Sequence, residues 1–379
     1  MMRKLISPAL LLSFVTACGS APPPPAPAPE PPPPPPPAVV ATAAPVEPPK
    51  PAEPTPEEKK KAEEAKKLEE DRAKMEADTK AEVARWTPEM HAEAKALAEK
   101  NYPTGHAAIQ AAMTAKERKP SNAARDKYRH PLETLDALGF KPTETVLEIG
   151  PGEGWYTELL APALAKKGKL LVTTADPNGP PDSRSTVNAQ HFKGFLDASP
   201  ELYGKVQPVI IDGKAPELHL DGTVDLVLIM RGLHGMHNNG VMKAWLGEIY
   251  KALKPNGVLG IEEHRAKADA SPDESSKKGY VPEKWAIAEI EAAGFKLATK
   301  SEVNANAKDT KDHPEGVWTL PPTFALKDKD HDKYAAIGES DRMTLKFVKV
   351  AAKPAPKAAT DKAAAPKGDK PATKPADKK

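Results

Sequence analysis

The chain has 379 residues with a formal net charge of +2 at pH 7, and 44 of its residues are proline. A length of this order permits two domains, but most of the prolines lie before residue 57 or after residue 350. Those ends lack the apolar residues that would offset the entropy lost on ordering them, so they are predicted to be disordered. The composition therefore excludes a second large domain, and the near-zero charge excludes general binding of nucleic acid.

The first residues have the features of an export signal. Basic residues precede a short apolar run at residues 5–15, which is too short for a transmembrane helix. The segment Val15-Thr16-Ala17-Cys18 resembles the lipobox of bacterial lipoproteins, which implies a signal peptide at residues 1–18 and a lipid on the thiol of Cys18. By the same resemblance, Gly19 implies sorting to the outer membrane, facing the periplasm. The alternative is an ordinary signal peptide with an incidental cysteine, although a lone cysteine cannot form an internal disulfide.

Between the export signal and the first strand, the sequence predicts a spacer and several helices. Residues 19–56 are mostly proline and alanine and favour an extended polyproline II linker. Residues 57–103 form a charged helical segment, whose opposite charges three or four residues apart support a single solvated helix at 57–85. Thr87 is the predicted N-cap of the next helix. Shorter helices are expected at residues 106–117, at 121–129 with Ser121 as the cap, and at 132–138 with Gly139 as the stop.

From residue 145 onward, short apolar segments alternate with helical ones. Alternation of this kind predicts an α/β fold, a Rossmann-like seven-stranded mostly parallel sheet with helices on both faces, in one domain at residues 104–351. The stretch 301–340 is long and polar, and a connection of such length is usually functional or disordered. Strands are expected at residues 145–149, 169–174, 206–211, 225–230, 257–261, 295–300 and 343–350, and helices at 155–165 and 241–253.

The strongest chemical signal is a glycine-rich segment that follows the first predicted strand and opens a predicted helix. Glycines in this position let the backbone approach a ligand closely. A dinucleotide fingerprint would need Gly or Ala at position 155, where Trp155 stands. The alternative spacing, acidic-x-G-x-G-x-G, is met in full by Glu148, Gly150, Gly152 and Gly154. This pattern resembles motif I of class I methyltransferases, whose loop wraps the cofactor S-adenosylmethionine.

Carboxylates follow the next two predicted strands. By the resemblance, Asp176 accepts hydrogen bonds from the ribose hydroxyls of the cofactor and Asp212 lies near its adenine. Each residue alone is more often part of a turn or a cap, but their order along the chain agrees with the methyltransferase pattern. Tyr156, next to the glycine loop, is assigned to the same cofactor site.

Other segments resemble the blocks of a group of predicted exported methyltransferases, over roughly residues 105–350. The resemblance implies S-adenosylmethionine as the cofactor and a methyl acceptor that is largely unassigned. One departure is Trp155, where that group usually has another glycine, and this bears on the width of the cofactor loop. The segments that carry the resemblance are residues 124–131, 154–157, 234–238, 253–258, 263–264, 291–295 and 340–347.

Histidines follow two strands that would be neighbours in a sheet of this kind. His234 and His237 follow the fourth predicted strand, and His264 follows the fifth. Methyl transfer needs an acceptor in line with the methyl carbon and, for a hydroxyl or an amine, removal of a proton. Histidine titrates near neutral pH and suits the role of base. Two alternatives stay open: loop histidines bonded to the backbone, and a metal site that includes Glu263, for which H-x-x-H alone is weak evidence.

These patterns lead to two hypotheses of function. The first is an enzyme that methylates a small molecule or an envelope component, with Arg129 and Arg231 holding an anionic acceptor or else serving as surface residues. The second is a non-catalytic binding module on the same fold, because S-adenosylmethionine is a cytoplasmic metabolite that an envelope protein would meet rarely. The basic tail at residues 352–379 is expected to stay solvated, with weak contact to anionic polymers as the alternative. The lipid anchor is the expected contact with the membrane, and no specific nucleic acid is expected as a partner.

Overall fold

A computed structural model describes residues 54–350 of the chain. The predicted signal peptide with Cys18, most of the proline-rich linker and the tail at 352–379 lie outside the described residues. Within 54–350, no helix combines the length and the apolar character needed to cross a bilayer.

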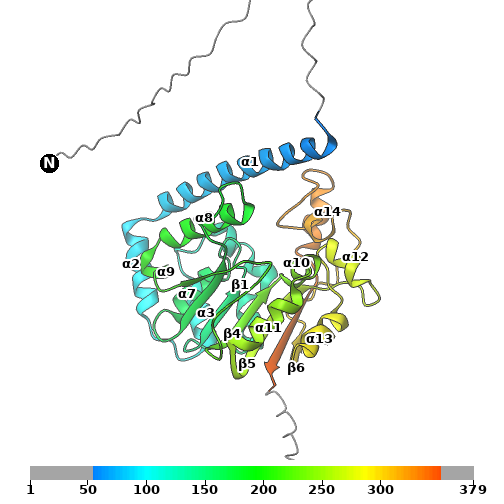
Figure 1. The fold of residues 1–379 in the computed structure, drawn as a ribbon. Coiled ribbons are helices and arrows are strands. Elements are labelled where there is room, and N and C mark those ends of the chain that lie inside the picture. Colours follow the sequence, from blue (N-terminus) through cyan, green and yellow to red (C-terminus); the bar gives the residue numbers. More distant parts are fainter. Residues whose placement is uncertain (1–53, 351–379) are drawn as a thin grey trace, which may run out of the picture. The chain divides into compact units, whose positions relative to one another are not determined.

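All seven predicted strands are present in one sheet, so the predicted fold class is confirmed (Figure 1). The strand order is β3-β2-β1-β4-β5-β7-β6, and the fourth and fifth strands are neighbours as expected. The ladders from β3 to β5 are parallel, whereas β7 is antiparallel to both of its neighbours. The strands are β1 (Thr145–Ile149), β2 (Lys169–Thr174), β3 (Gln207–Ile210), β4 (Val224–Met230), β5 (Leu253–His264), β6 (Phe295–Ser301) and β7 (Arg342–Lys349).

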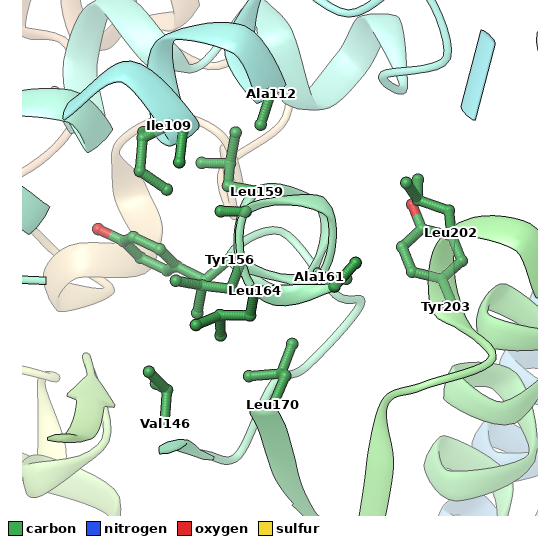
Figure 2. Close-up of a cluster of buried hydrophobic side chains, with 14 of the residues drawn as sticks. Ile109, Ala112, Val146, Tyr156, Leu159, Ala161, Leu164, Leu170, Leu202 and Tyr203 are labelled. Carbon is green, nitrogen blue, oxygen red and sulfur yellow. The ribbon is translucent and has the colours of Figure 1, made fainter. Parts of the chain in front are cut away.

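Helices cover both faces of the sheet, because its central strands are apolar on both sides. In β1, Val146 packs into one buried cluster and the next residue, Leu147, packs into the other. Figure 2 shows part of the first cluster, in which Ile109 and Leu159 lie where two helices meet, and Val146 comes from the sheet. The helices are α1 (Pro56–Arg85), α2 (Pro88–Glu99), α3 (Gly105–Met113), α4 (Pro120–Ala123), α5 (Asp126–Arg129), α6 (Pro131–Leu138), α7 (Thr157–Leu164), α8 (Arg184–Asp197), α9 (Pro200–Tyr203), α10 (Leu233–Asn238), α11 (Met242–Ala252), α12 (Pro272–Lys277), α13 (Glu283–Ala292), the 3-10 turn η1 (Gly316–Thr319) and α14 (His331–Ile337).

The long N-terminal helix α1 differs from the prediction in one respect. Its first turns are exposed, as expected for a solvated helix, but its second half packs along α8 (Figure 1). Arg184 of α8 pairs with Asp71 at 2.6 Å, and the buried Glu82 accepts a hydrogen bond from the indole of Trp86 at 2.9 Å. The sequence missed this contact because the charge pattern of the helix gives no apolar stripe to predict a partner. The predicted cap of α2 is confirmed, since Thr87 Oγ1 accepts from the Met90 amide at 3.2 Å.

Two short helices replace the single one predicted at residues 121–129. Pro120 begins α4 with Lys119 as the N-cap, so Ser121 lies inside the first turn and caps nothing. The next turn, α5, ends at His130 in left-handed backbone (φ 41°). Because α6 then begins at Pro131 and stops at Gly139 (φ 82°), its predicted stop is confirmed.

Further along, α7 begins at Thr157 rather than at the predicted Trp155. A turn comes first, in which the amide of Gly154 donates to the carbonyl of Pro151 at 3.0 Å. The glycine loop is therefore longer by two residues than the sequence suggested.

The long connection at 301–340 is an ordered cap over the edge of the sheet. Its centre is the buried Asp309, which accepts from Tyr280 Oη at 3.1 Å, from His313 Nε2 at 2.9 Å and from the Asp341 amide at 2.9 Å. A buried carboxylate needs several donors to offset the loss of water. This cluster explains how a polar segment with few apolar residues can hold a fixed conformation.

Candidate functional site

The glycine loop follows β1 and bends through left-handed backbone at Gly150 (φ 64°), Gly152 (φ 60°) and Gly154 (φ 82°). The amide of Gly150 donates to Thr173 Oγ1 of β2 at 2.9 Å, which fixes the start of the bend. A Cβ added at Gly150 or Gly152 would meet no atom within 4 Å. A Cβ at Gly154 would meet the Phe195 ring at 2.6 Å. The first two glycines therefore border open space, whereas the third is required by packing.

The indole of Trp155 leaves this space open. It is buried, and its Nε1 donates to the carbonyl of Asn122 at 3.0 Å. The guanidinium of Arg129 lies 4.7 Å from the centre of the ring, in a cation-π arrangement. Trp155 thus packs against the N-terminal helices, and the bulk that departs from the glycine pattern does not fill the bend.

Glu148 lies beneath the loop. It is buried and accepts from Thr157 Oγ1 at 2.7 Å, which ties the end of β1 to the start of α7. Burial raises the pKa of Glu148 to about 7, against an ordinary value of 4.5. Glu148 therefore braces the loop from below and does not face the open space.

Tyr156 is also fully enclosed. Its hydroxyl donates to Glu262 Oε2 at 2.8 Å, and burial, followed by the charge of Glu262, raises its pKa well above the ordinary value. The residue therefore belongs to the polar network around Glu262. A direct contact with the cofactor, as predicted from the sequence, has no support in this position.

Asp176 and Asp212 are exposed at the carboxyl ends of β2 and β3, on the same edge of the sheet as the loop. Each uses one carboxylate oxygen to close its own turn. Oδ1 of Asp176 accepts from the Asn178 amide at 2.8 Å, and Oδ1 of Asp212 accepts from the Lys214 amide at 2.9 Å. Both side chains are therefore held in place with a second oxygen available.

His234 lies in the first turn of α10, after β4, and pairs with a buried carboxylate. Its Nδ1 is 3.1 Å from Glu263 Oε1. Burial opposes protonation of His234, but the hydrogen bond and the charge of Glu263 outweigh it, so the pKa of His234 is raised. Glu263 also accepts from the Leu233 amide at 2.6 Å and from the His264 amide at 2.9 Å, so it caps α10, whose own N-cap residue is a glycine.

His264 ends β5 and lies next to His234, with 5.8 Å between the ring centres. Its Nδ1 forms a short hydrogen bond with Ser340 Oγ. Burial, together with the nearby charges of His234, Arg342 and Arg231, lowers the pKa of His264 well below its ordinary value. The imidazole of His264 is therefore neutral at physiological pH.

His237, the third predicted histidine, is not part of this group. Its Nε2 lies 2.8 Å from Asp273 Oδ1, and its ring packs edge-on against Trp285 at 4.7 Å. One helical turn places His237 against α12 and α13, whereas His234 faces β5. The sequence treated H-x-x-H as one unit because residues three apart share a face in a long helix, and this six-residue helix has a different neighbour on each side of that face. Within residues 54–350, no group of three or more His, Cys, Asp or Glu side chains is arranged to hold a metal ion.

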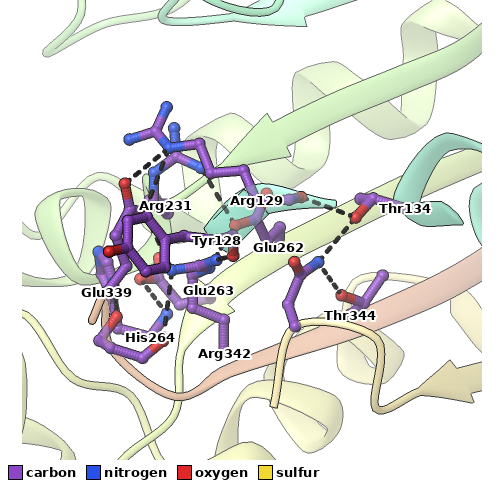
Figure 3. Close-up of polar contacts among 12 residues, drawn as sticks. Tyr128, Arg129, Thr134, Arg231, Glu262, Glu263, His264, Glu339, Arg342 and Thr344 are labelled. Carbon is purple, nitrogen blue, oxygen red and sulfur yellow. Dashed lines mark hydrogen bonds and ion pairs between the residues drawn. The ribbon is translucent and has the colours of Figure 1, made fainter. Parts of the chain in front are cut away.

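Behind the two histidines lies a buried network of charges, which Figure 3 shows. Glu262 Oε1 is 3.1 Å from Arg231 Nη1 and 2.6 Å from Arg342 Nε. Burial raises the pKa of Glu262, but the two arginine charges outweigh that effect and hold it below its ordinary value. Glu339 pairs with Arg129 at 3.2 Å and with Arg342 at 3.1 Å.

The sequence singled out Arg129 and Arg231 but missed their partners. Arg125, Glu339 and Arg342 were part of the resemblance or adjacent to it, without a role assigned. A run such as Glu339-Ser340-Asp341-Arg342 at the start of a strand was the available signal, since charges are rare at positions where a strand becomes buried.

A cavity of about 150 Å³ opens between this network and the 301–340 connection. Its polar wall consists of arginines and His264, and its apolar wall comes from η1 and the prolines that follow. The lining residues are Arg125, Arg129, Arg231, His264, Val317, Trp318, Pro321, Pro322, Thr323, Glu339 and Ser340.

The segment that contains the glycine loop, His234 and His264 is similar to a known family of domains. Residues 121–301 match the family model described as a methyltransferase domain. This match covers just under half of the chain, and within it the chain is similar to a methyltransferase domain. Among curated proteins, none matches the sequence of the chain.

Solved structures with a similar arrangement include methyltransferases, all with low identity to this chain. A methyltransferase dependent on S-adenosylmethionine from Aquifex aeolicus is 18% identical, with 61% of this chain and 94% of that chain covered and a TM-score of 0.40. Phosphoethanolamine N-methyltransferase 2 from Haemonchus contortus, in complex with phosphomonomethylethanolamine and S-adenosylhomocysteine, is 17% identical, with 59% and 52% covered and a TM-score of 0.40. The [4+2]-cyclase SpnF is 18% identical, with 58% and 80% covered and a TM-score of 0.41.

Proposed function

We propose that this chain binds S-adenosylmethionine over the open bend of the glycine loop and transfers the methyl group to an acceptor that enters beside His264. The observation that carries the proposal is the free space at Gly150 and Gly152, where an added Cβ would meet no atom within 4 Å. Left-handed backbone without side chains lets a ligand approach the main chain closely. The bend remains free because Trp155 packs against Asn122.

The residues around the bend have separate tasks in this proposal. When bound, S-adenosylmethionine supplies an electrophilic methyl group on a sulfonium centre. The free carboxylate oxygens of Asp176 and Asp212 accept hydrogen bonds from the ribose hydroxyls and the adenine, since each side chain is already oriented by its own turn. Glu148 acts indirectly, because its contact is with Thr157 beneath the loop.

His264 is the proposed base for an acceptor that must lose a proton. Its lowered pKa leaves the imidazole neutral and therefore able to accept a proton. In the tautomer that has its proton on Nδ1, which bonds to Ser340 Oγ, the lone pair is on Nε2, and Nε2 has no hydrogen-bond partner within residues 54–350. Beside His264, His234 pairs with Glu263, and Glu263 orients the start of α10 by accepting from the Leu233 amide.

The proposal is tested by melting the full chain with and without S-adenosylhomocysteine. At a concentration 100 times the dissociation constant, a ligand adds about 2.7 kcal/mol to the free energy of unfolding. For a domain of this size, that corresponds to a rise in melting temperature of roughly 5–10 °C. A melting temperature that does not change at millimolar S-adenosylhomocysteine would instead favour the non-catalytic binding module.

We also propose that the chain is an envelope lipoprotein anchored through Cys18, with an envelope component or a small molecule as the methyl acceptor. The support is the segment Val15-Thr16-Ala17-Cys18, preceded by a short apolar run. More than one acyl chain on the new N-terminus would anchor the protein firmly. Metabolic labelling with an alkyne fatty acid is expected to mark the wild type and to fail with Cys18→Ser, and equal labelling of both would contradict the anchor.

A further inference from the structure

Three arginines from distant parts of the chain meet at the cavity beside His264. Arg125 and Arg129 come from the two short turns before α6, and Arg231 comes from the end of β4. Their side chains are 25%, 6% and 18% exposed. Removing guanidinium groups from water is costly unless acceptors replace the water. If the cavity has fewer hydrogen-bond acceptors than these guanidinium groups require, a bound anion would supply the missing ones.

Two carboxylates are shared among four guanidinium groups. Glu339 accepts from Nε of Arg125 at 3.1 Å and from Nε of Arg129 at 3.2 Å, and it also pairs with Arg342. Glu262 serves Arg342 and Arg231. His264 adds no charge because its imidazole is neutral. The cavity and its wall therefore carry an excess of positive charge.

Neighbouring charges act on Arg125. Burial lowers the pKa of Arg125, and the charge of Arg231 adds to that effect, whereas the charges of Glu339 and Glu153 oppose it. Arg231 has left-handed backbone (φ 60°), which is uncommon for a side chain of this size. Its amide donates to the Glu262 carbonyl at 2.6 Å, which holds the residue in that conformation. A strained backbone at a charged residue is characteristic of positions that serve a site.

The donors that remain point to the kind of group that completes the site. Arg125 and Arg129 bond to Glu339 through Nε, and within residues 54–350 their terminal nitrogens have no hydrogen-bond partner. A guanidinium presents those nitrogens as a planar fork that matches two oxygens of one anion. The cavity thus has a wall of oriented donors without an equal number of acceptors.

We infer that the cavity binds an anionic group of the methyl acceptor, a carboxylate or a phosphate, through the terminal nitrogens of Arg125 and Arg129. The inference rests on the proposed function, and it names the substrate class for the same site. A volume of about 150 Å³ is smaller than the roughly 300–1,000 Å³ of pockets that enclose a whole small molecule, so it admits one charged group rather than an entire acceptor. Trp318 and the prolines of the 301–340 connection line the same cavity, and the anion so held brings the rest of the acceptor beside His264.

The experiment measures anion binding to the full chain by calorimetry, with S-adenosylhomocysteine at saturation and with inorganic phosphate or acetate as the probe. Phosphate or acetate is expected to bind, and Arg125→Gln is expected to weaken that binding by about tenfold or more, as for a lost hydrogen bond to a charged group. Arg125→Lys keeps the charge but loses the fork, so it is expected to have an intermediate affinity and serves if Arg125→Gln does not fold. Arg184→Gln is the matched control, since Arg184 is 49% exposed and its ion-pair partner within residues 54–350 is Asp71 on α1.

Each outcome separates the inference from the proposed function. Anion binding that is absent, or equal in Arg125→Gln and the wild type, overturns the inference while binding of S-adenosylhomocysteine still supports the function. Weaker binding of S-adenosylhomocysteine itself in Arg125→Gln also overturns it, because the arginines would then hold the carboxylate of the cofactor. Anion binding that depends on Arg125 without any binding of S-adenosylhomocysteine supports the anion site and overturns the proposed function. Whichever probe binds with the higher affinity, inorganic phosphate or acetate, indicates whether the anionic group of the acceptor is a phosphate or a carboxylate.

Discussion

The carboxyl edge of the sheet has an open half, at the ends of β1, β2 and β3, and a closed half, at the ends of β4 and β5. Each half contains a fully buried glutamate. Burial raises the pKa of Glu148 in the open half to about 7, and the more distant charge of Arg231 only partly opposes that effect. In the closed half, Arg231 and Arg342 hold the pKa of Glu262 below its ordinary value despite equal burial. The same residue type is thus favoured as an acid in one half and as an anion in the other.

The two halves are built in different ways. The open half is shaped by the backbone: the glycines of the loop and the Asx turns at Asp176 and Asp212 leave space for a ligand. The closed half is shaped by side chains, since Glu262 and Glu339 are each shared by more than one arginine. Partners that are shared in this way depend on one another. Substitutions are therefore expected to act locally in the open half and to spread in the closed half.

The largest effect is expected from Glu262→Gln in the closed half. The neutral amide leaves Arg231 and Arg342 buried with too few anions, and breaking a buried pair of this kind costs about 3–5 kcal/mol in the free energy of unfolding. Glu274→Gln is the matched control, because Glu274 pairs with Lys277 at 2.8 Å on the surface and its loss should change stability by no more than about 0.5 kcal/mol. Unfolding of both variants in denaturant gives the comparison. Equal stability of the two would mean that the closed half does not depend on its charges.

The next effect concerns binding at the open half. Gly152→Val fills the free side of the bend and also puts a β-branched residue at φ 60°, so the affinity for S-adenosylhomocysteine is expected to fall by at least about 100-fold. Gly222→Val is the control for backbone strain alone. Gly222 has φ 63° and nothing within 4 Å of an added Cβ, but it precedes β4 at the opposite edge of the sheet, away from the proposed cofactor site. Calorimetric titration of both variants separates the two causes. An unchanged affinity in Gly152→Val would show that the cofactor site is elsewhere.

The smallest effect is a dependence of stability on pH through Glu148. Its folded pKa of about 7 is above the ordinary 4.5, so between these values the unfolded chain has lost the proton that the folded chain keeps. The contribution of Glu148 to the free energy of unfolding therefore falls as pH rises through that window and is constant above it. Glu148→Gln removes this term, so the variant should gain about 2 kcal/mol relative to the wild type between about pH 5 and about pH 8. Parallel stability curves for the two proteins would indicate that Glu148 ionises normally.

Much of the fold was predictable because it depends on patterns along the chain. Apolar strands alternating with helices predicted the sheet, and the Thr87 cap and the Gly139 stop were confirmed by their local geometry. The prediction of Ser121 as a cap was wrong, because Pro120 starts that helix one residue earlier. The packing of α1 on α8 was missed, because a helix with charges all round gives no indication of its partner.

The candidate site was predictable only in part, because some of its contacts depend on tertiary packing and not on patterns along the chain. The free bend at Gly150 and Gly152 follows from residue type, since only glycine adopts that backbone without strain. The grouping of His234 with His264 came from the expected neighbourhood of β4 and β5, whereas the separation of His237 depends on where α12 and α13 pack. No pattern in the sequence around Arg125 predicts an ion pair with Glu339, which is far away in the chain.

Patterns along the chain predicted the strands, most of the helices and a side-chain-free bend after β1, because these depend on local backbone preference and on periodic burial. Which charges share a partner depends instead on the folded chain: Arg125 and Arg129 reach Glu339 from a segment remote in the sequence, and Arg342 pairs with it from β7. Such pairings are fixed by three-dimensional packing and by the cost of leaving a buried charge without a counterion, and neither leaves a regular spacing in the sequence.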